Sequence, residues 1–424
     1  MAGVRRWWGA NVGGLPGSFW YLWLGTLISR ASAFVIIVLA FYLVQERGFS
    51  AAFAGLVFGL FGAGNAFGVL VGGVLADRWG RRATALTGHL ASAVVLVALG
   101  LAVEPVAIAA LATLLGFVSN LVRPAFGAMM ADIVPPTDRL RAFSLNYWAI
   151  NVGFSIAAIL AGMTAGVSYL LLFLVDAAGA VLTGLVIFLK VPETRPAVPA
   201  PVQGEAAPGG TMTVFRDGVF MGFVGLTLVT SLVFMQHIST LPVAMQLDGL
   251  SAATYGWVIA LNGILIVAGQ LFVPRLINGR SRTGVLAVAA LVMAVGFGLT
   301  AYADAAWLYA ITVLVWTLGE MLQSPSNSTL IADLSPAALR GRYQGVFSLA
   351  FSGAAFAAPI LGGYVLQDFG STTLWLGCTA LGVLAAAGYL ATGPARERRA
   401  ALLRAEELSP APAAPRPAPE PVAA

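Results

Sequence analysis

Charged side chains are scarce in this sequence. Of its 424 residues, 59% are hydrophobic and only 10% are charged, and the mean hydropathy is +0.88. So few polar groups cannot cover the surface of a water-soluble protein of this length. A lipid bilayer is therefore the expected main solvent of the chain, and in a bilayer only helices or closed barrels satisfy the backbone.

Cysteine, histidine and lysine are almost absent, which excludes three kinds of site. The single cysteine, Cys378, cannot form an intramolecular disulfide, and the two distant histidines, His89 and His237, cannot form an H-E-x-x-H zinc helix. The one lysine, Lys190, follows a leucine, so the sequence has no Walker A phosphate loop. We therefore expect no metal, no cofactor and no enzymatic activity.

Twelve apolar runs are present, each long enough to cross a bilayer as a helix. Their approximate ranges are 19–44, 51–76, 83–103, 105–131, 142–166, 168–190, 218–243, 252–277, 284–303, 305–331, 343–366 and 371–392. Of the 23 basic residues, 20 fall on the side of the two termini, which the positive-inside rule makes cytoplasmic. The net charge of +5 therefore reflects membrane topology and not nucleic-acid binding.

The sequence repeats itself at an offset of 201 residues. Pairs in this register include Gly48/Gly249, Ser50/Ser251, Gly55/Gly256, Leu75/Leu276, Pro124/Pro325, Leu160/Leu361 and Gly162/Gly363. The run Ala131-Asp132-x-x-Pro135-x-x-x-Arg139-x-Arg141 returns as Ala332-Asp333-x-x-Pro336-x-x-x-Arg340-x-Arg342. Shared hydrophobicity does not explain this match, so we expect an all-α membrane protein of two pseudo-symmetric six-helix bundles.

The domain boundaries follow from the apolar runs. We expect a cytoplasmic N-terminus over 1–18, six-helix bundles over 19–190 and 218–392, a cytoplasmic linker over 191–217, and a largely disordered cytoplasmic tail over 393–424. Proline, alanine and glycine dominate the linker and the end of the tail, and such a composition cannot bury a core. The charged segment 396–408 is the part of the tail that can form a helix on the membrane face.

Small residues mark two helix faces. The second run carries glycines at close to four-residue spacing: Gly55, Gly59, Gly64, Gly68 and Gly72. Their expected partners in the eleventh run are Ser348, Ser352, Gly353 and Ala357. Such a face lets another helix approach closely, either as static packing or as a sliding contact used during a conformational change.

The loop after the second run reads Gly73-Val74-Leu75-Ala76-Asp77-Arg78-Trp79-Gly80-Arg81-Arg82 and resembles the signature loop of the major facilitator superfamily. Over about residues 19–392, the chain is most similar to bacterial drug exporters of the proton-antiport type in that superfamily. The resemblance implies a central cavity lined by helices 1, 4, 7 and 10, which opens alternately to each side of the membrane.

The same loop also has a direct physical interpretation. Asp77 can stabilise the N-terminus of a neighbouring helix, while the arginines bind acidic partners. We interpret the following residues as a conformational latch: Gly73, Asp77, Arg78, Gly80, Arg81 and Arg82. A positive-inside anchor is the alternative. The second-half copy, 278–282, has no acidic residue, so only the first half is expected to latch through a carboxylate.

Four charged residues interrupt the apolar runs: Arg30, Arg123, Asp176 and Glu320. An ionised side chain at mid-bilayer costs about 2.5–3.5 kcal/mol, so these side chains are expected to face the protein interior or water. Glu320 is the first candidate for proton coupling and His237 the second, because each can gain and lose a proton. For Asp176, solvent contact or a structural hydrogen bond is expected.

By the repeat, Arg123 corresponds to Ser324, one helical turn from Glu320. We hypothesise that Arg123 and Glu320 face each other across the cavity and pair in one state. The alternative is a permanent buried pair that only fixes helix packing. Arg30 either binds an anionic group or offsets the charge of Glu320.

The expected substrate-binding residues are few and mostly amides or aromatic rings. They are Arg30, Arg123, Gln236, Asn120, Gln323, Asn327, Trp316 and Phe34. A mostly apolar cavity suits amphipathic organic molecules better than sugars, which need many paired hydroxyl contacts.

We therefore expect a monomeric secondary transporter that exports small amphipathic organic compounds, drugs among them, in exchange for protons. Arginine outnumbers lysine 22 to 1, which is typical of a GC-rich bacterial genome and favours the bacterial inner membrane. The first alternative is a symporter or uniporter that imports an organic anion. The second is a non-transporting membrane scaffold or sensor.

Overall fold

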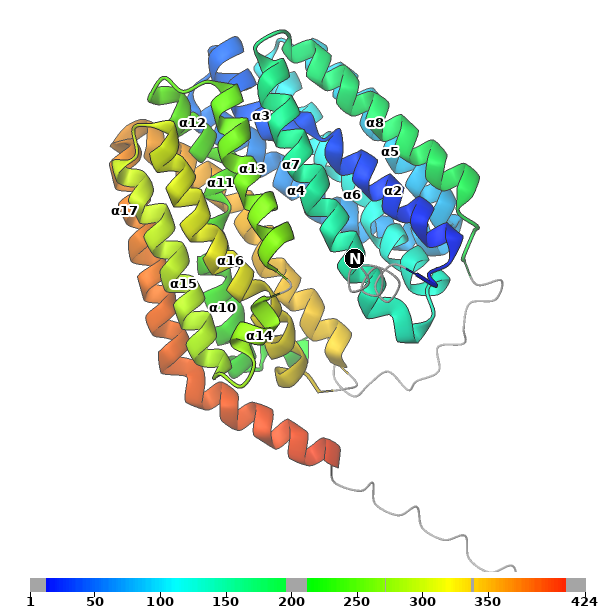
Figure 1. Ribbon diagram of the computed structural model, residues 1–424, viewed down its shortest axis with the longest axis vertical. Coiled ribbons are helices and arrows are strands. Elements are labelled where there is room, and N and C mark those ends of the chain that lie inside the picture. Colours follow the sequence, from blue (N-terminus) through cyan, green and yellow to red (C-terminus); the bar gives the residue numbers. More distant parts are fainter. Residues whose placement is uncertain (1–12, 196–211, 271, 337–338, 409–424) are drawn as a thin grey trace, which may run out of the picture.

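The computed structural model describes residues 13–195, 212–270, 272–336 and 339–408, and this part of the chain is helical with no strand (Figure 1). Eleven of its helices are long and apolar enough to cross a membrane. The longest, α17 (Arg340–Leu408), consists of two helices joined at Gly370, where φ is 84°. The described residues thus contain twelve spanning segments, which confirms the predicted all-α membrane fold.

Figure 1 shows the two halves side by side, the first in blue to green and the second in green to red. The first half contains α2 (Gly17–Ala31), α3 (Phe34–Phe41), a π-helical turn (Tyr42–Glu46), α4 (Ala51–Trp79), α5 (Arg81–Leu101), α6 (Pro105–Ile133), a 3-10 turn (Pro136–Asp138), α7 (Arg139–Ala165) and α8 (Tyr169–Lys190). The second contains α9 (Met212–Phe215), α10 (Gly218–Phe234), α11 (Gln236–Ser239), α12 (Leu241–Leu247), α13 (Ala252–Gly269), α14 (Val273–Ile277), α15 (Arg282–Leu299), a 3-10 turn (Thr300–Tyr302), α16 (Ala306–Leu334) and α17.

The sequence repeat is a structural repeat. Ser50 caps the N-terminus of α4 and Ser251 caps that of α13, each by accepting a hydrogen bond from the backbone N–H three residues later. Just before these caps, Gly48 and Gly249 both adopt positive φ, 70° and 77°. Glycine fits this conformation at no steric cost, so the matched Gly-x-Ser pattern sets the same helix start in both halves.

The first span of each half is interrupted at an equivalent position. α2 ends at Ala31 and α3 begins at Phe34, while α10 ends at Phe234 and the short α11 and α12 follow. In the first half, the break frees the backbone N–H of Val35, which donates to Asp176 Oδ2 on α8 at 3.2 Å. Asp176 thus has the structural hydrogen bond expected as one of its two roles.

The apolar core is shared on one side of the bundle and divided on the other. We call the side that carries the start of α2 the terminal face, and the other side the opposite face. A continuous buried cluster that includes Ala54, Ala158 and Leu366 joins the two halves toward the opposite face. Separate clusters around Phe19 in the first half and Phe220 in the second lie toward the terminal face. Within the described residues, the halves are therefore joined from the opposite face to about the middle of the bundle, where Gly62 and Gly263 make the last of these contacts.

Two equivalent backbone contacts make this junction. α4 packs on α17 with Gly55 against the carbonyl group of Pro359, and α13 packs on α7 with Gly256 against that of Ala158. Both partners of one contact lie 201 residues from their counterparts in the other, so one contact occurs twice. A Cβ atom at either glycine would overlap the carbonyl oxygen, which explains the need for glycine.

The glycine row of α4 contacts two different helices. The part toward the opposite face lies against α17: Gly55, Gly59 and Gly62. The part toward the terminal face lies against α6 in the same half: Gly64, Gly68 and Gly72. The predicted partners Ser348 and Gly353 are exposed, because α4 and α17 separate toward the terminal face. The predicted contact with them is wrong in this conformation, and α17 uses Ala355–Gly363 instead.

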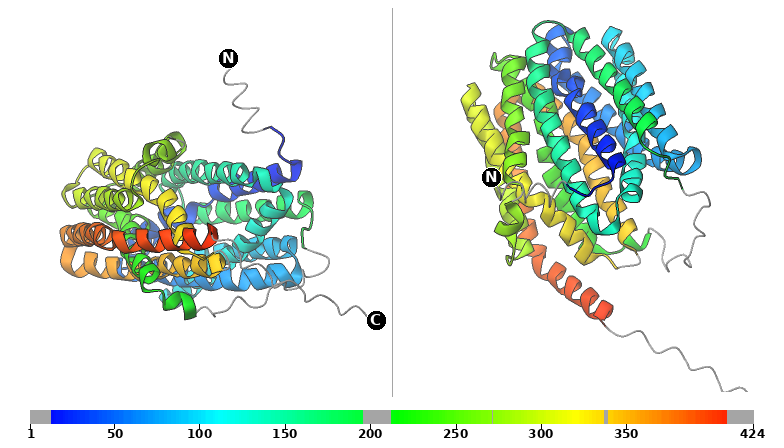
Figure 2. Two further views of the ribbon diagram at one scale, coloured as in Figure 1. Left: turned by 90° about the horizontal axis from the view of Figure 1, so that it is seen from below. Right: turned by 45° about the vertical axis from the view of Figure 1, so that its right-hand side comes forward.

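The ends of the chain are described in part. α17 continues beyond the predicted last span and stays helical to Leu408, as expected for the charged segment 396–408 (Figure 2). Ala400 of this extension is buried in the apolar cluster around Phe220 of the second half, and Leu403 is also buried. Of the predicted linker, residues 191–195 and α9 are described, while 196–211, 1–12 and 409–424 lie outside the described residues.

Candidate functional site

Three charged side chains of the spanning helices point into the protein. Each lies nine residues, or two and a half turns, from a large exposed apolar side chain: Arg30 from Tyr21 (40% exposed), Arg123 from Leu114 (44%) and Glu320 from Ile311 (43%). Positions two and a half turns apart point in opposite directions, so the charges face away from the apolar outer surface. The expectation that these three charges avoid lipid is supported by this geometry.

The three charges lie at similar depths. From the helical rise, Arg30 is about 20 Å from the start of α2, Arg123 about 15 Å from the end of α6, and Glu320 about 21 Å from the end of α16. All three helix ends belong to the terminal face. The charges therefore occupy a layer about 6 Å thick near the middle of the membrane, with two cations in the first half and a carboxylate in the second.

Glu320 is bound by a neutral partner. Its Oε2 accepts a hydrogen bond of 2.7 Å from the side-chain amide of Asn262 on α13, and that amide also donates to Thr317 Oγ1 at 3.1 Å. From the other half, Tyr147 on α7 lies within electrostatic reach of Glu320. No cation contacts Glu320 among the described residues. The pair with Arg123 is thus not formed in this conformation and stays a prediction for another one.

Arg30 and Arg123 are neighbours on the first-half side of this layer. Their positive charges act on each other, and both residues are exposed to solvent even though they face inward. Within the described ranges, neither guanidinium has a hydrogen-bond or ion-pair partner. Water therefore reaches the membrane interior at these two arginines.

His237 and Gln236, the candidate residues on the seventh span, form hydrogen bonds where that span is interrupted after α10. The Nδ1–H group of His237 donates to the carbonyl oxygen of Phe234 at 2.6 Å, and the two rings are in contact. Gln236 donates to the carbonyl oxygen of Ala358 on α17 at 3.0 Å and accepts a hydrogen bond from Thr240. His237 and Gln236 are only 7% and 5% exposed, so neither lines a solvent-filled space in this conformation.

The amide candidates divide into two kinds. Asn120 on α6 donates to Asn65 on α4, and Gln323 on α16 donates to Thr230 on α10 at 2.8 Å. By contrast, the Oδ1 atom of Asn327 is buried and has no hydrogen-bond partner within the described structure. Among these candidate amides, Asn327 is therefore the one whose side-chain oxygen is an unsatisfied hydrogen-bond acceptor.

The aromatic candidates do not line a cavity. Trp316 is fully buried and stacks on Phe297 of α15, with ring centroids 5.6 Å apart, while Phe34 is 5% exposed in the shared core. The prediction that both form the apolar surface of the cavity is wrong for this conformation. The cause for Trp316 is Gly296, whose missing side chain leaves the space that the indole fills.

Two residues of the Glu320 environment are absent from the sequence-based set. Asn262 lies on α13, which is not among the helices that the superfamily resemblance assigns to the cavity, and its counterpart in the repeat is the apolar Phe61. Tyr147 has no sequence signal beyond its aromatic ring. The signal available for Asn262 was an amide within an apolar run, because buried amides in membranes need a specific partner.

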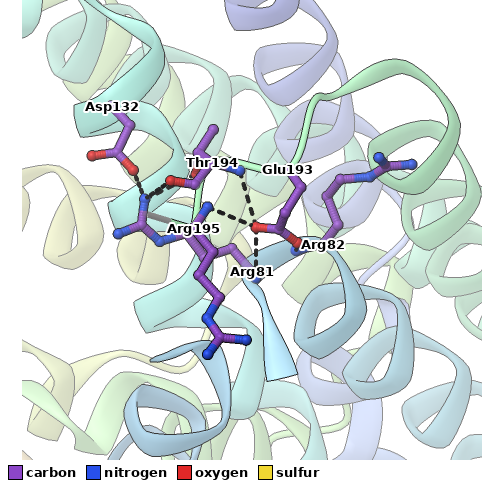
Figure 3. A network of polar contacts seen from close by, with 6 residues as sticks. All are labelled: Arg81, Arg82, Asp132, Glu193, Thr194 and Arg195. Carbon is purple, nitrogen blue, oxygen red and sulfur yellow. Dashed lines mark hydrogen bonds and ion pairs between the residues drawn. The ribbon is translucent and has the colours of Figure 1, made fainter. Parts of the chain in front are cut away.

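A polar network joins the start of α5, the end of α6 and the segment after α8 at the terminal face of the first half (Figure 3). Arg81 forms an ion pair with Asp132 at the end of α6 and donates to Thr194 Oγ1 at 2.9 Å. The carboxylate of Glu193 accepts hydrogen bonds from the backbone N–H groups of Arg81 and Arg82 at 3.0 and 3.1 Å. These N–H groups begin α5, so Glu193 stabilises the N-terminus of that helix.

The surroundings of Glu193 keep it charged. Burial alone would raise the pKa of Glu193, but hydrogen bonds from four backbone N–H groups together lower it. Asp77, the carboxylate predicted for this role, is exposed and makes no side-chain hydrogen bond or ion pair in the described part of the chain. The prediction is wrong in position, because the carboxylate at the start of α5 belongs to Glu193 in the segment after α8.

The other latch residues have separate roles in this conformation. Gly80 adopts φ 101° and turns the chain between α4 and α5. The carbonyl oxygen of Arg78 accepts a hydrogen bond of 2.7 Å from Arg195, and Arg82 lies over the ring of Phe188. Gly73 has open space at its Cβ position.

The second half repeats the ion pair of the first. Arg282 pairs with Asp333, and these residues lie 201 positions after Arg81 and Asp132. Asp333 also binds Arg404 of the α17 extension at 3.1 Å. The expectation that only one half latches through a carboxylate is therefore wrong, because the carboxylate of the second half comes from the end of α16 and not from the loop 278–282.

A separate cavity of about 360 Å³ lies at the opposite face of the first half, between the π-helical turn and the start of α8. Tyr42, Glu46, Arg47 and Tyr169 line it, so it is distinct from the mid-membrane charges. No group of three or more metal-ligating side chains comes together among the described residues.

The model of the major facilitator superfamily matches the chain over residues 22–359 and, through the repeat, again over 249–420. The chain belongs to the major facilitator superfamily. Solved transporter structures show the same fold at low sequence identity. A nucleoside transporter, NupG, superposes with a TM-score of 0.76 at 15% identity, covering 89% of this chain and 99% of that chain. A POT family transporter in complex with 5-aminolevulinic acid gives 0.78 at 14% identity, covering 91% and 97%.

Sequence relatives of this superfamily member are bacterial membrane transporters. It is 26% identical over 343 residues to the uncharacterized MFS-type transporter YttB of Bacillus subtilis (strain 168), covering 79% of this chain and 84% of that protein. It is 25% identical over 355 residues to a Na(+), Li(+), K(+)/H(+) antiporter of Planococcus maritimus, covering 76% and 83%. It is 23% identical over 355 residues to the multidrug resistance protein MdtH of Aeromonas hydrophila, covering 82% and 87%.

Proposed function

We propose that this major facilitator protein exports small amphipathic organic compounds, drugs among them, in exchange for protons. The observation that carries the proposal is Glu320, a carboxylate in the mid-membrane layer that faces inward and is held by the neutral amide of Asn262. No cation pairs with Glu320 among the described residues, so protonation of this carboxylate would not leave a buried positive charge unpaired. Glu320 can therefore take up a proton when one side of the membrane is open and release it when the other is open.

The described conformation supports alternating access. The halves touch at the opposite face through Gly55 and Gly256, and their cores are separate toward the terminal face. Solvent reaches Arg30 and Arg123 in this state. Tilting of the halves about the glycine contacts would close the terminal face and open the opposite one, as in other transporters built from repeats.

We place the terminal face in the cytoplasm of a bacterial inner membrane. The support is the charge distribution, because 20 of the 23 basic residues fall on that side. Both termini are then cytoplasmic, and the described state is open to the cell interior. One chain contains both halves and all three charges, so a monomer suffices for transport. The names of two relatives, a cation/proton antiporter and a multidrug resistance protein, agree with export coupled to protons.

Transport in everted membrane vesicles with and without an imposed pH gradient tests the proposal. Compounds are first chosen from a chemically varied panel by their accumulation in cells that lack the gene. The pH gradient should drive uptake into everted vesicles, and Glu320→Gln should abolish the effect of the gradient while leaving compound binding. Asp304→Asn, a change at an exposed carboxylate outside the layer, is the matched control and should transport normally. Unchanged gradient-driven transport by Glu320→Gln would refute the coupling role.

Import of an organic anion by symport or uniport is the second candidate. The unpaired Arg30 and Arg123 favour it, because a carboxylate would complete both guanidiniums. Right-side-out vesicles distinguish the two directions, since an importer accumulates its compound there and an exporter does not. A scaffold or sensor would move no compound of the panel in either kind of vesicle, and Glu320→Gln would then have no transport phenotype.

A further inference from the structure

Two positive charges of the mid-membrane layer have no negative partner in the protein. Arg30 and Arg123 face inward and repel each other, and no acceptor in the described residues binds either guanidinium. The carboxylate at the same depth, Glu320, is hydrogen-bonded to Asn262 on the other half. The first-half side of the layer thus carries a concentrated positive charge of about two units, which no carboxylate of the described residues balances.

The polar groups near these arginines are already paired with one another. Thr26, one turn from Arg30, donates to Asn146 on α7 at 2.8 Å. Asn120, about one turn from Arg123, donates to Asn65 on α4. Small rotations of these side chains therefore do not supply an acceptor for the arginines without breaking an existing hydrogen bond.

Such an arrangement is costly unless something compensates it. An arginine at mid-membrane is costly to hold away from water, and a second one nearby adds repulsion. A guanidinium presents a planar set of N–H donors that matches the two oxygens of a carboxylate. An acidic group placed between Arg30 and Arg123 would neutralise both charges and satisfy their donors.

An aromatic surface continues from the arginines toward the terminal face. Trp23 lies seven residues before Arg30, on the same face of α2 and about 10 Å nearer the terminal face. Its ring stacks on Trp148 of α7, with centroids 6.4 Å apart, and Trp148 is 42% exposed. A ligand with an acidic end at the arginines would therefore place a flat apolar end against these indoles.

We infer that Arg30 and Arg123 form a subsite for the acidic group of the transported compound, and that this compound is an amphipathic organic acid with an aromatic or apolar body. The inference rests on the proposed transport function but not on its direction. It narrows the substrate class to molecules that carry a carboxylate, which the superfamily membership leaves open.

A matched pair of fluorescent probes tests the subsite. Dansylglycine carries a carboxylate, and dansylglycinamide has the same dansyl group with a neutral amide. Energy transfer from tryptophan to dansyl reports binding to the purified full-length protein in nanodiscs at pH 7. We expect the protein to bind dansylglycine at least about tenfold more tightly than the amide, as for a charge-assisted hydrogen-bonded pair. High salt should reduce the difference.

Variants then assign the preference to the two arginines. Arg30→Gln and Arg123→Gln should each bring the affinity for dansylglycine close to that for the amide, and Arg123→Lys should keep part of the preference. Arg280→Gln removes an exposed arginine of the loop between α14 and α15 and should change nothing. Equal binding of the two probes, binding of neither, or a preference that survives both glutamine variants would overturn the subsite.

The two proposals fail in distinguishable ways. If the preference for dansylglycine is absent while transport of any panel compound still depends on the pH gradient and on Glu320, the subsite is refuted and the transport function stands. If the preference is present but no compound is moved, the protein binds organic acids without proton-coupled transport.

Discussion

Gly256 lies against the backbone carbonyl group of Ala158, so that α13 of the second half and α7 of the first touch with no side chain between them. The equivalent contact between α4 and α17 lies at the same face. Together they hold the opposite face closed. A leucine at Gly256 would overpack this contact, at a cost of about 1–3 kcal/mol to the closed arrangement. The balance between the two conformations should then shift by about 5–150-fold toward opening of the opposite face.

Spin labels at Val167 and Leu247, which are exposed on opposite halves of that face, measure the shift. Since Cys378 is the one cysteine, replacing it leaves a background free of other labelling sites. The inter-label distance should lengthen in Gly256→Leu. Gly225→Leu is the control, because open space surrounds Gly225. An unchanged distance in Gly256→Leu would mean that the contact does not hold the halves together.

A leucine at Gly68 should affect stability and not the distance between the halves, because Gly68 packs on Phe117 of α6 within the first half. We expect Gly68→Leu to lower the free energy of unfolding by about 1–3 kcal/mol without changing the distance between labels at Val167 and Leu247. Thermal unfolding in detergent and the same label pair provide the two measurements. A lengthened distance would show that the α4–α6 contact also moves during transport.

The fold was largely predictable because its signals are local and repeated. The length of apolar runs predicted the spans, and the 201-residue offset predicted the two halves, which the matched caps at Ser50 and Ser251 confirm. The interruptions after Ala31 and Phe234 were not predictable, since both segments are continuous in hydropathy. Helix periodicity also could not predict the burial of Trp316, because the space that its indole fills is left by Gly296 on a different helix, α15.

The sequence predicted which charged residues belong to the candidate site, but it did not predict their hydrogen-bond partners. The cost of an ionised group in lipid identified Arg30, Arg123 and Glu320 as inward-facing side chains. In the structure, Glu320 accepts a hydrogen bond from Asn262, and neither arginine has a hydrogen-bond or ion-pair partner among the described residues. Asn262 was missed because its role comes from the packing of α13 on α16, which no spacing within the sequence encodes.

The hydrogen bond between Asn262 and Glu320 should show a measurable coupling. Asn262→Ala, Glu320→Gln and the double variant form a thermodynamic cycle. A hydrogen bond to a charged group contributes about 1.5–3 kcal/mol, so the effects of the single variants on unfolding in a detergent should be non-additive by about that amount when Glu320 is ionised. Additive effects would show that the bond does not contribute to this conformation.

The repeated ion pairs at the terminal face should differ in strength. Asp333 binds both Arg282 and Arg404 and its side chain is 16% exposed, whereas Asp132 binds Arg81 and is 40% exposed. Exposed pairs contribute about 0–1 kcal/mol, and less solvated ones contribute more. Asp333→Asn should therefore lower the melting temperature more than Asp132→Asn, with high salt reducing the effect of Asp132→Asn first. Equal shifts would contradict the role of Arg404.

Glu193 should make stability depend on pH. Its folded-state pKa is lowered, so the carboxylate stabilises the start of α5 above the pKa of the unfolded chain, and the stabilisation is lost as pH falls through the folded-state value. Glu193→Gln removes the charged acceptor and should lower the free energy of unfolding at neutral pH by about 0.5–1 kcal/mol, a value limited by solvent exposure. The difference from the wild type should vanish in acid.

Glu104→Gln is the control, because Glu104 stands at the N-cap of α6 without a side-chain capping bond. Thermal unfolding from neutral to acidic pH measures all three proteins, and a constant difference between the wild type and Glu193→Gln would mean that packing and not the carboxylate charge stabilises this helix start.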